Sequence, residues 1–280
     1  MKEKRIIAVG IVLMLVAGAT GQVVSDKECL PVVEWSTRPV TEGVTLKTAQ
    51  TRLFDSFQAI YVIDIDTTAG EFEFGVAVPA TRLVTSAIAA NEEVLAAVNG
   101  TFFNMQEGFN VHFVKVNDSV VAATDEKEYG IRATGLFSAE GEAVNISPWG
   151  PEREDHRAVQ EEDAIVSGPL LMDDGRDIPL DSINFNKLRH PRTMIGATDD
   201  GHILFIVVDG RQPEYAEGMS LFELRELAKS LGCTDVLNLD GGGSTAMYLR
   251  GEESNGVVNR PSGKVERTVP SIVFVKEKDN

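Results

Sequence analysis

Alternation of apolar and polar residues is the dominant pattern of the chain, and this period of two is typical of β-strands. It predicts strands over residues 58–66, 71–78, 94–98 and 269–275, hairpins over 111–122, 135–146 and 193–208, and an interrupted apolar strand over 164–172. Turn-forming residues 67–70 predict that the first two strands form a hairpin. Residues 85–93 favour a short helix.

A second helix is marked more strongly, just after residue 220. Ser220 is a favourable N-cap, and Glu223 follows three residues later, which completes a capping box. Apolar residues recur at helical spacing up to Leu231, and Gly232 stands where a helix commonly ends. The capping box accounts for Glu223 structurally, so we assign it no catalytic role.

The remaining segments suggest how the chain is organised. Residues 20–56 are polar and weakly patterned, and we expect an irregular lead-in to a domain over residues 57–280. Residues 148–163 are charged and contain two prolines, which predicts an exposed excursion. The whole pattern predicts an α+β fold, a single domain with a mixed or antiparallel β-sheet core and few helices.

Residues 1–19 have the features of a secretory signal peptide. Basic residues precede an apolar run, 6–16, and small residues at 17–19 place cleavage near 19–21. The run is short for a membrane span, which needs about 20 apolar residues. We expect an exported protein, periplasmic or secreted, with no stable membrane insertion after cleavage.

Charge narrows the possible partners. The 280 residues include 26 Lys and Arg against 43 Asp and Glu, for a net charge of −17. This balance argues against nonspecific nucleic-acid binding and against docking on an anionic membrane, because both depend on basic residues. An anionic substrate would need a local cluster of positive groups.

The sequence demands no cofactor or metal. Cys29 and Cys233 can pair in an exported protein, and Cys233 can equally be a small buried residue. No spacing of cysteines and histidines predicts zinc. Ca²⁺ can bind to aspartate and asparagine oxygens, but no ligand spacing requires it.

Candidate chemistry concentrates in three clusters, each where a predicted strand enters a loop. They are 99–104 (NGTFFN), 190–193 (HPRT) with 208–211 (VDGR), and 238–245 (NLDGGGST). The three glycines at 241–243 can bring their N–H groups together around an anion, or form a bulge without a ligand. No lysine follows them as in a Walker A loop, and the aspartate spacing of an EF-hand is missing.

Ser244 lies in a sequence close to the nucleophile elbow G-x-S-x-G, with Ala246 in place of the last glycine. That elbow requires a later histidine, whereas all four histidines of this chain precede Ser244. Ser244 is therefore predicted to bind substrate or cap a turn.

Two aspartates and two arginines supply charge to these clusters. Asp209 and Asp240 each follow an apolar strand and precede glycine. Such a pair can flank a glycosidic bond as acid/base and nucleophile, or each can bond to the backbone of its own turn. Arg192 and Arg211 carry fork-shaped donors that suit phosphate, unless they form surface ion pairs. Neutral groups that suit sugar hydroxyls come from Asn99, Asn104, Asn238 and Asn259.

Seven segments, in this order, resemble the phosphodiester glycosidase family: NGTFFN, SGPLL, HPRTMIG, VVDGRQ, GMSLFELRELAKSLG, NLDGGGSTAMY and NGVVNRPS. The resemblance runs from about residue 94 to 275, and LDGGGS with the downstream VNRPS is its most specific part. Thr101 stands where the family pattern has a second glycine.

The resemblance implies hydrolysis of a sugar-1-phosphodiester at the sugar C1–O bond, which yields a free sugar and a phosphomonoester. It implies that Asp240 and Asp209 are catalytic and that a sugar phosphate or glycan is the partner. The implied substrate-binding residues are Asn99, Gly100, Asn104, Gly168, Arg192, Thr193, Arg211, Gly241, Gly242, Gly243, Ser244 and Asn259.

Two other functions fit the same residues. A non-catalytic glycan-binding protein would bind saturably without turnover. A glycosidase that acts on a phosphate-free polysaccharide would depend little on Arg192 and Arg211.

Overall fold

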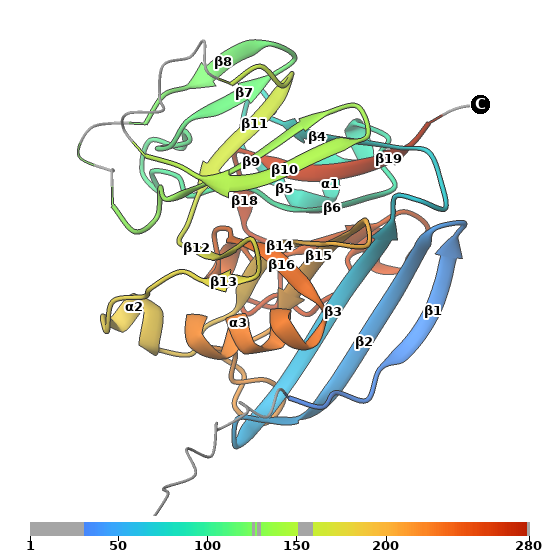
Figure 1. Ribbon diagram of the computed structural model, residues 1–280, viewed down its shortest axis with the longest axis vertical. Coiled ribbons are helices and arrows are strands. Elements are labelled where there is room, and N and C mark those ends of the chain that lie inside the picture. Colours follow the sequence, from blue (N-terminus) through green and yellow to red (C-terminus); the bar gives the residue numbers. More distant parts are fainter. Residues whose placement is uncertain (1–30, 125–126, 128–129, 151–158, 279–280) are drawn as a thin grey trace, which may run out of the picture.

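The computed structural model describes residues 31–124, 127, 130–150 and 159–278. An eight-stranded sheet fills the lower half of the molecule, and smaller sheets fill the upper half (Figure 1). Every pairing of neighbouring strands in these sheets is antiparallel. The strand-rich α+β prediction is therefore confirmed.

The strands of the eight-stranded sheet come from two separate stretches of the chain, residues 36–66 and 170–238. In spatial order they are β1 (Ser36–Thr41), β2 (Val44–Leu53), β3 (Ser56–Asp66), β15 (His202–Val208), β14 (Arg192–Thr198), β16 (Cys233–Asn238), β12 (Leu170–Asp173) and β13 (Arg176–Asp177).

The upper half contains three smaller sheets. The five-stranded sheet has the order β10 (Ala143–Pro148), β9 (Gly135–Glu140), β11 (Asp163–Ser167), β7 (Val114–Val116) and β8 (Ser119–Ala122). The four-stranded sheet has the order β17 (Met247–Leu249), β6 (Ala96–Asn99), β19 (Ile272–Glu277) and β4 (Phe72–Ala77). The two-stranded sheet pairs β18 (Thr268–Val269) with β5 (Leu83–Val84).

Three α-helices occur in the described residues: α1 (Thr85–Asn91), α2 (Asn184–Lys187) and α3 (Leu221–Ser230). Short 3₁₀ turns cover Gly242–Ser244 and Ser254–Gly256. The predicted capping box of α3 is confirmed, because Ser220 Oγ accepts from the Glu223 N–H and Glu223 Oε2 accepts from the Ser220 N–H. None of the described helices is long and apolar enough to cross a membrane.

Apolar residues cover both faces of the eight-stranded sheet. Along β15, Phe205 and Val207 join the core shared with the smaller sheets, whereas Leu204 and Ile206 join the core beneath α3. This two-sided burial explains why β15 is an almost unbroken apolar run.

The hairpins predicted over 111–122, 135–146 and 193–208 are confirmed by the pairs β7–β8, β9–β10 and β14–β15. The hairpin predicted over 58–78 is wrong. β3 pairs with β2 and β15, whereas β4 pairs with β19 in another sheet. The turn between β3 and β4 carries the chain from one sheet to the other. Apolar and polar residues alternate along both strands whichever strand each of them pairs with.

The irregular conformation predicted for residues 20–56 is wrong for residues 36–53, which form β1 and β2. β1 is an edge strand with mostly exposed side chains, and β2 mixes threonine and lysine with apolar residues. Pairing with β3 organises this segment, so its own hydrophobicity is a weak signal. The predicted signal peptide, Cys29 and residues 151–158 of the predicted excursion lie outside the described residues.

Candidate active site

Asn99 joins the three motif loops. It ends β6, and its Nδ2 donates to the backbone oxygen of Asp240 (2.7 Å), just beyond β16. Its Oδ1 accepts from Thr193 Oγ1 (2.8 Å) on β14 and from the Ala246 N–H (3.2 Å). These bonds occupy both ends of the amide, so Asn99 and Thr193 hold the motif loops together, and neither residue lines the pocket at which these loops meet.

A pocket of about 340 Å³ opens where these loops meet. Its lining residues are Phe102, Arg132, Phe185, His190, Arg192, Arg211, Asp240, Gly241, Gly242, Gly243 and Arg267. Four guanidinium groups thus accompany one carboxylate, in a chain whose net charge is −17. Such a local excess of planar cationic donors suits a phosphate or carboxylate ligand.

Asp240 is the acidic residue of this lining. Burial raises the pKa of its carboxyl to about 6, and the Ser244 side chain, the Gly241 N–H, Arg267 and Arg132 oppose that rise. The Gly241 N–H donates to Asp240 Oδ1 at 2.9 Å. A carboxyl whose pKa lies near neutral pH is suited to general acid–base catalysis, and its ionised form is suited to nucleophilic attack.

The three glycines line the pocket, and the N–H groups of two of them are already bonded within the chain. The Gly241 N–H bonds to Asp240, and the Gly242 N–H donates to Pro191 O at 2.8 Å. The missing side chains serve packing instead. A Cβ on Gly243 would collide with the Arg267 guanidinium, and one on Gly242 (φ 63°) would lie 3.0 Å from Arg211 Nη2.

Arg192 is buried, and backbone oxygens fix its orientation. Its Nε donates to Met219 O (3.0 Å), and its Nη2 donates to Phe185 O (2.8 Å) and Leu188 O (3.0 Å). Nη1 is therefore the atom that can reach a ligand. Burial and the positive charges of Arg211 and Arg132 lower the Arg192 pKa to about 10, so the group stays charged at neutral pH.

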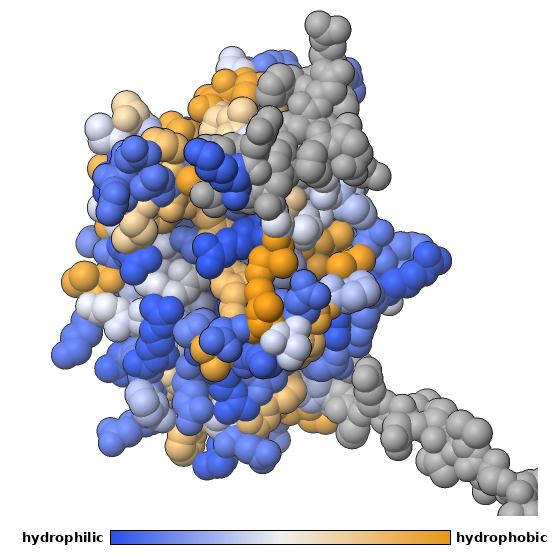
Figure 2. Space-filling model, turned by 90° about the vertical axis from the view of Figure 1, so that its left-hand side faces the viewer, coloured by the Kyte–Doolittle hydropathy of each residue, from blue (hydrophilic) through white to orange (hydrophobic). Residues whose placement is uncertain are grey.

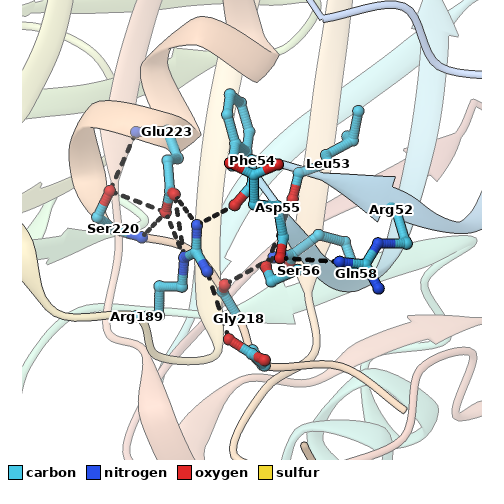
Figure 3. Close-up of polar contacts among 11 residues, drawn as sticks. Arg52, Leu53, Phe54, Asp55, Ser56, Gln58, Arg189, Gly218, Ser220 and Glu223 are labelled. Atoms are coloured by element: carbon cyan, nitrogen blue, oxygen red, sulfur yellow. Dashed lines mark hydrogen bonds and ion pairs between the residues drawn. The ribbon is translucent and has the colours of Figure 1, made fainter. Parts of the chain in front are cut away.

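An ion-pair network holds the segment that leads into Arg192 (Figure 3). Arg189 Nε donates to both carboxylate oxygens of Glu223 (3.0 and 3.1 Å), its Nη1 to Glu217 (3.3 Å) and its Nη2 to Phe54 O. Glu223 therefore serves both the capping box and this ion pair. The network ties the tip of the β2–β3 hairpin to the start of α3 and to the pocket loop.

Asp209 lies outside the pocket lining, so the structure does not bring the two predicted catalytic carboxylates into one pocket. Its oxygens accept from Asn259 Nδ2 (2.8 Å) and the Arg260 N–H (2.9 Å), and Asn259 Oδ1 accepts from the Met247 N–H (2.9 Å). Burial raises the pKa of Asp209 to about 6. These contacts join VVDGRQ to VNRPS through Asp209 and Asn259, and neither of these predicted site residues lines the pocket.

Other predicted residues also shape loops and do not line the pocket. Asn104 Oδ1 accepts from the N–H groups of Gln106 (2.9 Å) and Glu107 (3.1 Å), which closes a turn. Gly168 precedes a cis proline, and its backbone oxygen accepts from Asn238 Nδ2 at 2.7 Å. A Cβ on Gly100 would collide with Ser271.

Five lining residues were missing from the predicted site. Phe102 lies in the motif NGTFFN and His190 in HPRTMIG, so these motifs could have indicated both residues. Arg132, Phe185 and Arg267 lie outside the motifs and gave none. Arg132 sits over the rings of Phe102 (5.0 Å) and Phe185 (4.6 Å), which holds its guanidinium at the pocket.

The donor set does not favour a cation. Four arginines line the pocket with one carboxylate, and in the described residues no three His, Cys, Asp or Glu side chains are grouped so that they could hold a metal ion. The pocket therefore does not fit the Ca²⁺ that aspartate and asparagine made conceivable. Cys233 is buried and free among the described residues, and burial raises its thiol pKa to about 12.

One titratable carboxylate among fixed cations, at the strand ends of this fold, is an arrangement that suits an active site for an anionic ligand. The profile of the phosphodiester glycosidase family matches residues 92–276. The chain therefore belongs to the phosphodiester glycosidase family, and the resemblance seen in the sequence is confirmed.

Two curated relatives match parts of the chain. The SPbeta prophage-derived uncharacterized protein YomE of Bacillus subtilis (strain 168) is 32% identical over 93 residues, 33% of this chain and 14% of that protein. The N-acetylglucosamine-1-phosphodiester alpha-N-acetylglucosaminidase of Mus musculus is 25% identical over 174 residues, 55% of this chain and 32% of that protein. The chain thus spans less than a third of each relative.

A solved structure shares the fold over most of the chain. It is the zebrafish N-acetylglucosamine-1-phosphodiester alpha-N-acetylglucosaminidase catalytic domain, auto-inhibited by its pro-peptide. The TM-score is 0.69 at 16% identity, over 89% of this chain and 92% of that one. The part of the chain that the family profile matches, residues 92–276, therefore contains its phosphodiester glycosidase domain.

Proposed function

We propose that the protein hydrolyses a sugar-1-phosphodiester at the sugar C1–O bond. The observation that carries the proposal is the position of Asp240, the one carboxylate of a pocket that four arginines also line. The name of the mouse relative specifies an N-acetylglucosamine-1-phosphodiester, and we propose the same substrate class here.

The arginines favour departure of the phosphate. As the C1–O bond breaks, negative charge develops on the leaving phosphate, and fixed cations stabilise that charge without reorganising. A phosphomonoester is stable as an anion, so it needs little protonation to leave. Arg192 suits this task because three backbone oxygens already hold its guanidinium in place.

Ionised Asp240 acts on the sugar side, either by attacking C1 or by taking a proton from the water that attacks. In both routes water supplies the hydroxyl group at C1, and its remaining proton passes to the phosphomonoester or to solvent. A covalent route retains the configuration at C1, whereas direct attack by water inverts it. NMR of the first-formed anomer distinguishes these routes.

Hydrolysis in ¹⁸O-labelled water tests which bond breaks. The methyl diester of N-acetylglucosamine-1-phosphate should yield methyl phosphate without ¹⁸O, because all of its oxygens come from the substrate. Labelled methyl phosphate would assign P–O cleavage and contradict the proposal. Saturable binding with no product would instead support the non-catalytic glycan-binding alternative.

The value of kcat/KM should rise with pH through an apparent pKa of about 6. Asp240 must be ionised to act, and burial raises its pKa to that value, whereas the phosphodiester stays ionised throughout. His190 is the control, because burial and the charges of Arg192 and Arg211 lower its pKa from 6.5. His190→Asn should keep the acid limb; its disappearance in that variant, or a limb near pH 4, would contradict the assignment.

We also propose that the protein is exported. Support comes from the signal pattern of residues 1–19. A mature N-terminus near residues 20–22, found by sequencing protein from the periplasm or medium, would agree with export. An intact Met1 on protein confined to the cytoplasm would contradict it.

A further inference from the structure

A groove of about 410 Å³ lies beside the pocket, between the segment that follows β4, the 108–110 loop and β8. Eight of its twelve lining residues are apolar, including Val78, Pro79, Phe109, Val121, Ala122 and Pro270, and polar and apolar atoms share its surface about equally. Arg82 is its one charged lining residue within the described chain. This groove shares no lining residue with the cationic pocket.

The groove continues into an exposed apolar surface. Phe109 is 54% exposed, Val121 is 48% exposed and Val120 is 42% exposed. Both valines lie on β8, an edge strand of the five-stranded sheet, and exposed edges normally carry charge or are covered. Figure 2 shows hydrophobic atoms near the top of the molecule, the end at which Figure 1 places β8. A patch of this kind commonly marks a binding surface.

Met105 connects the groove to the pocket. Arg267, which lines the pocket, has its Nη1 3.9 Å from Met105 Sδ. Arg82, which lines the groove, donates from its Nη1 to Met105 O at 3.4 Å. The 102–110 loop also spans the two, because it gives Phe102 to the pocket and Phe109 to the groove.

A phosphodiester has two ester arms, and the pocket accounts for one of them. With the sugar at Asp240 and the phosphate among the arginines, the second arm can leave past Arg267 and Met105 into the groove. Along this path the lining changes from four arginines and one carboxylate to mostly apolar side chains around one arginine. A hydrocarbon arm matches that change, and each buried methylene strengthens binding about fourfold.

We propose that the groove binds the second ester arm, and that the substrates are sugar-1-phosphodiesters whose second arm is a long hydrocarbon chain. This inference rests on the proposed function of the pocket. Arg82 and Arg267 both contact Met105, the residue that the arm would pass.

The test compares the n-octyl and methyl diesters of N-acetylglucosamine-1-phosphate, with the octyl ester kept below its micelle concentration. The ratio of their kcat/KM values should be about 100 in the wild-type protein, which corresponds to three or four buried methylenes. It should fall to near 1 in Val121→Asp and in Phe109→Asp. In the control Val32→Asp, at an apolar residue that is 85% exposed, the ratio should stay near 100.

Four results would overturn the inference. A wild-type ratio near 1 with hydrolysis of both esters would reject the hydrocarbon arm and leave the function of the pocket intact. A high ratio that persists in both groove variants, with unchanged thermal unfolding, would show that the hydrocarbon arm binds elsewhere on the protein. Hydrolysis of neither ester would reject the function and the inference together. A dimer that Val121→Asp disrupts, together with a ratio near 1, would assign this face to self-association.

Discussion

Asp240→Asn is expected to lower kcat on a sugar-1-phosphodiester by about a thousandfold or more, because it removes the base or nucleophile. The fold should persist. An asparagine oxygen at this position can still accept from the Gly241 N–H, which now donates to Asp240 Oδ1 at 2.9 Å. Burial raises the folded pKa of Asp240 above its unfolded value, so ionisation costs stability as pH rises through about 6. The neutral variant should therefore unfold at an equal or higher temperature at pH 8.

Asp209→Asn is the matched control for this experiment. It makes the same chemical change at a carboxyl whose pKa burial also raises to about 6, but outside the pocket lining. We expect a loss of activity of about tenfold or less, since Asp209 acts through the loops that it joins. Steady-state kinetics and thermal unfolding of both variants separate the two roles. Full activity in Asp240→Asn would remove that residue from the mechanism.

Gly243→Ala should lower kcat/KM on the methyl diester by about a hundredfold, because the added methyl group displaces the side chain of Arg267. A new Cβ would occupy the space of the Arg267 guanidinium, so that flexible side chain must leave its present position. Arg267→Ala should cause a similar loss, because removal of one charge-stabilising donor typically costs two or three orders of magnitude.

The double variant Gly243→Ala/Arg267→Ala tests whether Gly243 acts through Arg267. If the glycine acts through the arginine, the double variant should be no worse than either single variant. Gly263→Ala is the control, since its Cβ would make only an ordinary 3.6 Å contact with Val265 O. Additive losses in the double variant would show that Gly243 has a separate role.

Much of the strand content was predictable, because three hairpins turn at polar pairs between alternating strands. Strand partners were harder to predict. Nothing in the alternation of β3 and β4 indicates that β4 pairs with β19, some 200 residues later in the chain. β1 and β2 were missed because their pairing with β3, and not their own hydrophobicity, makes them strands.

The site was predictable where residues lie in motifs and unpredictable where distant loops meet. Asp240 and its glycines were found because aspartate next to glycine at a strand end is a local pattern. Asp209 has the same local pattern, and only the fold turns its carboxyl toward Asn259 and Arg260. Arg132 and Arg267 reach the pocket from loops without a recognisable motif, so sequence spacing gave no sign of them.

The hydrogen bonds of Asn99 form a cross-link that distinguishes two sets of pocket residues: those that the bonds hold together and those that lie outside them. Asp240 and the strand that carries Arg192 are bound to one another through this amide and Thr193, so a change in one disturbs the others. Arg132 and Arg267 enter on loops outside that cross-link. Substitution of Arg132 or Arg267 should therefore leave the cross-link, and with it the backbone around Asp240, in place.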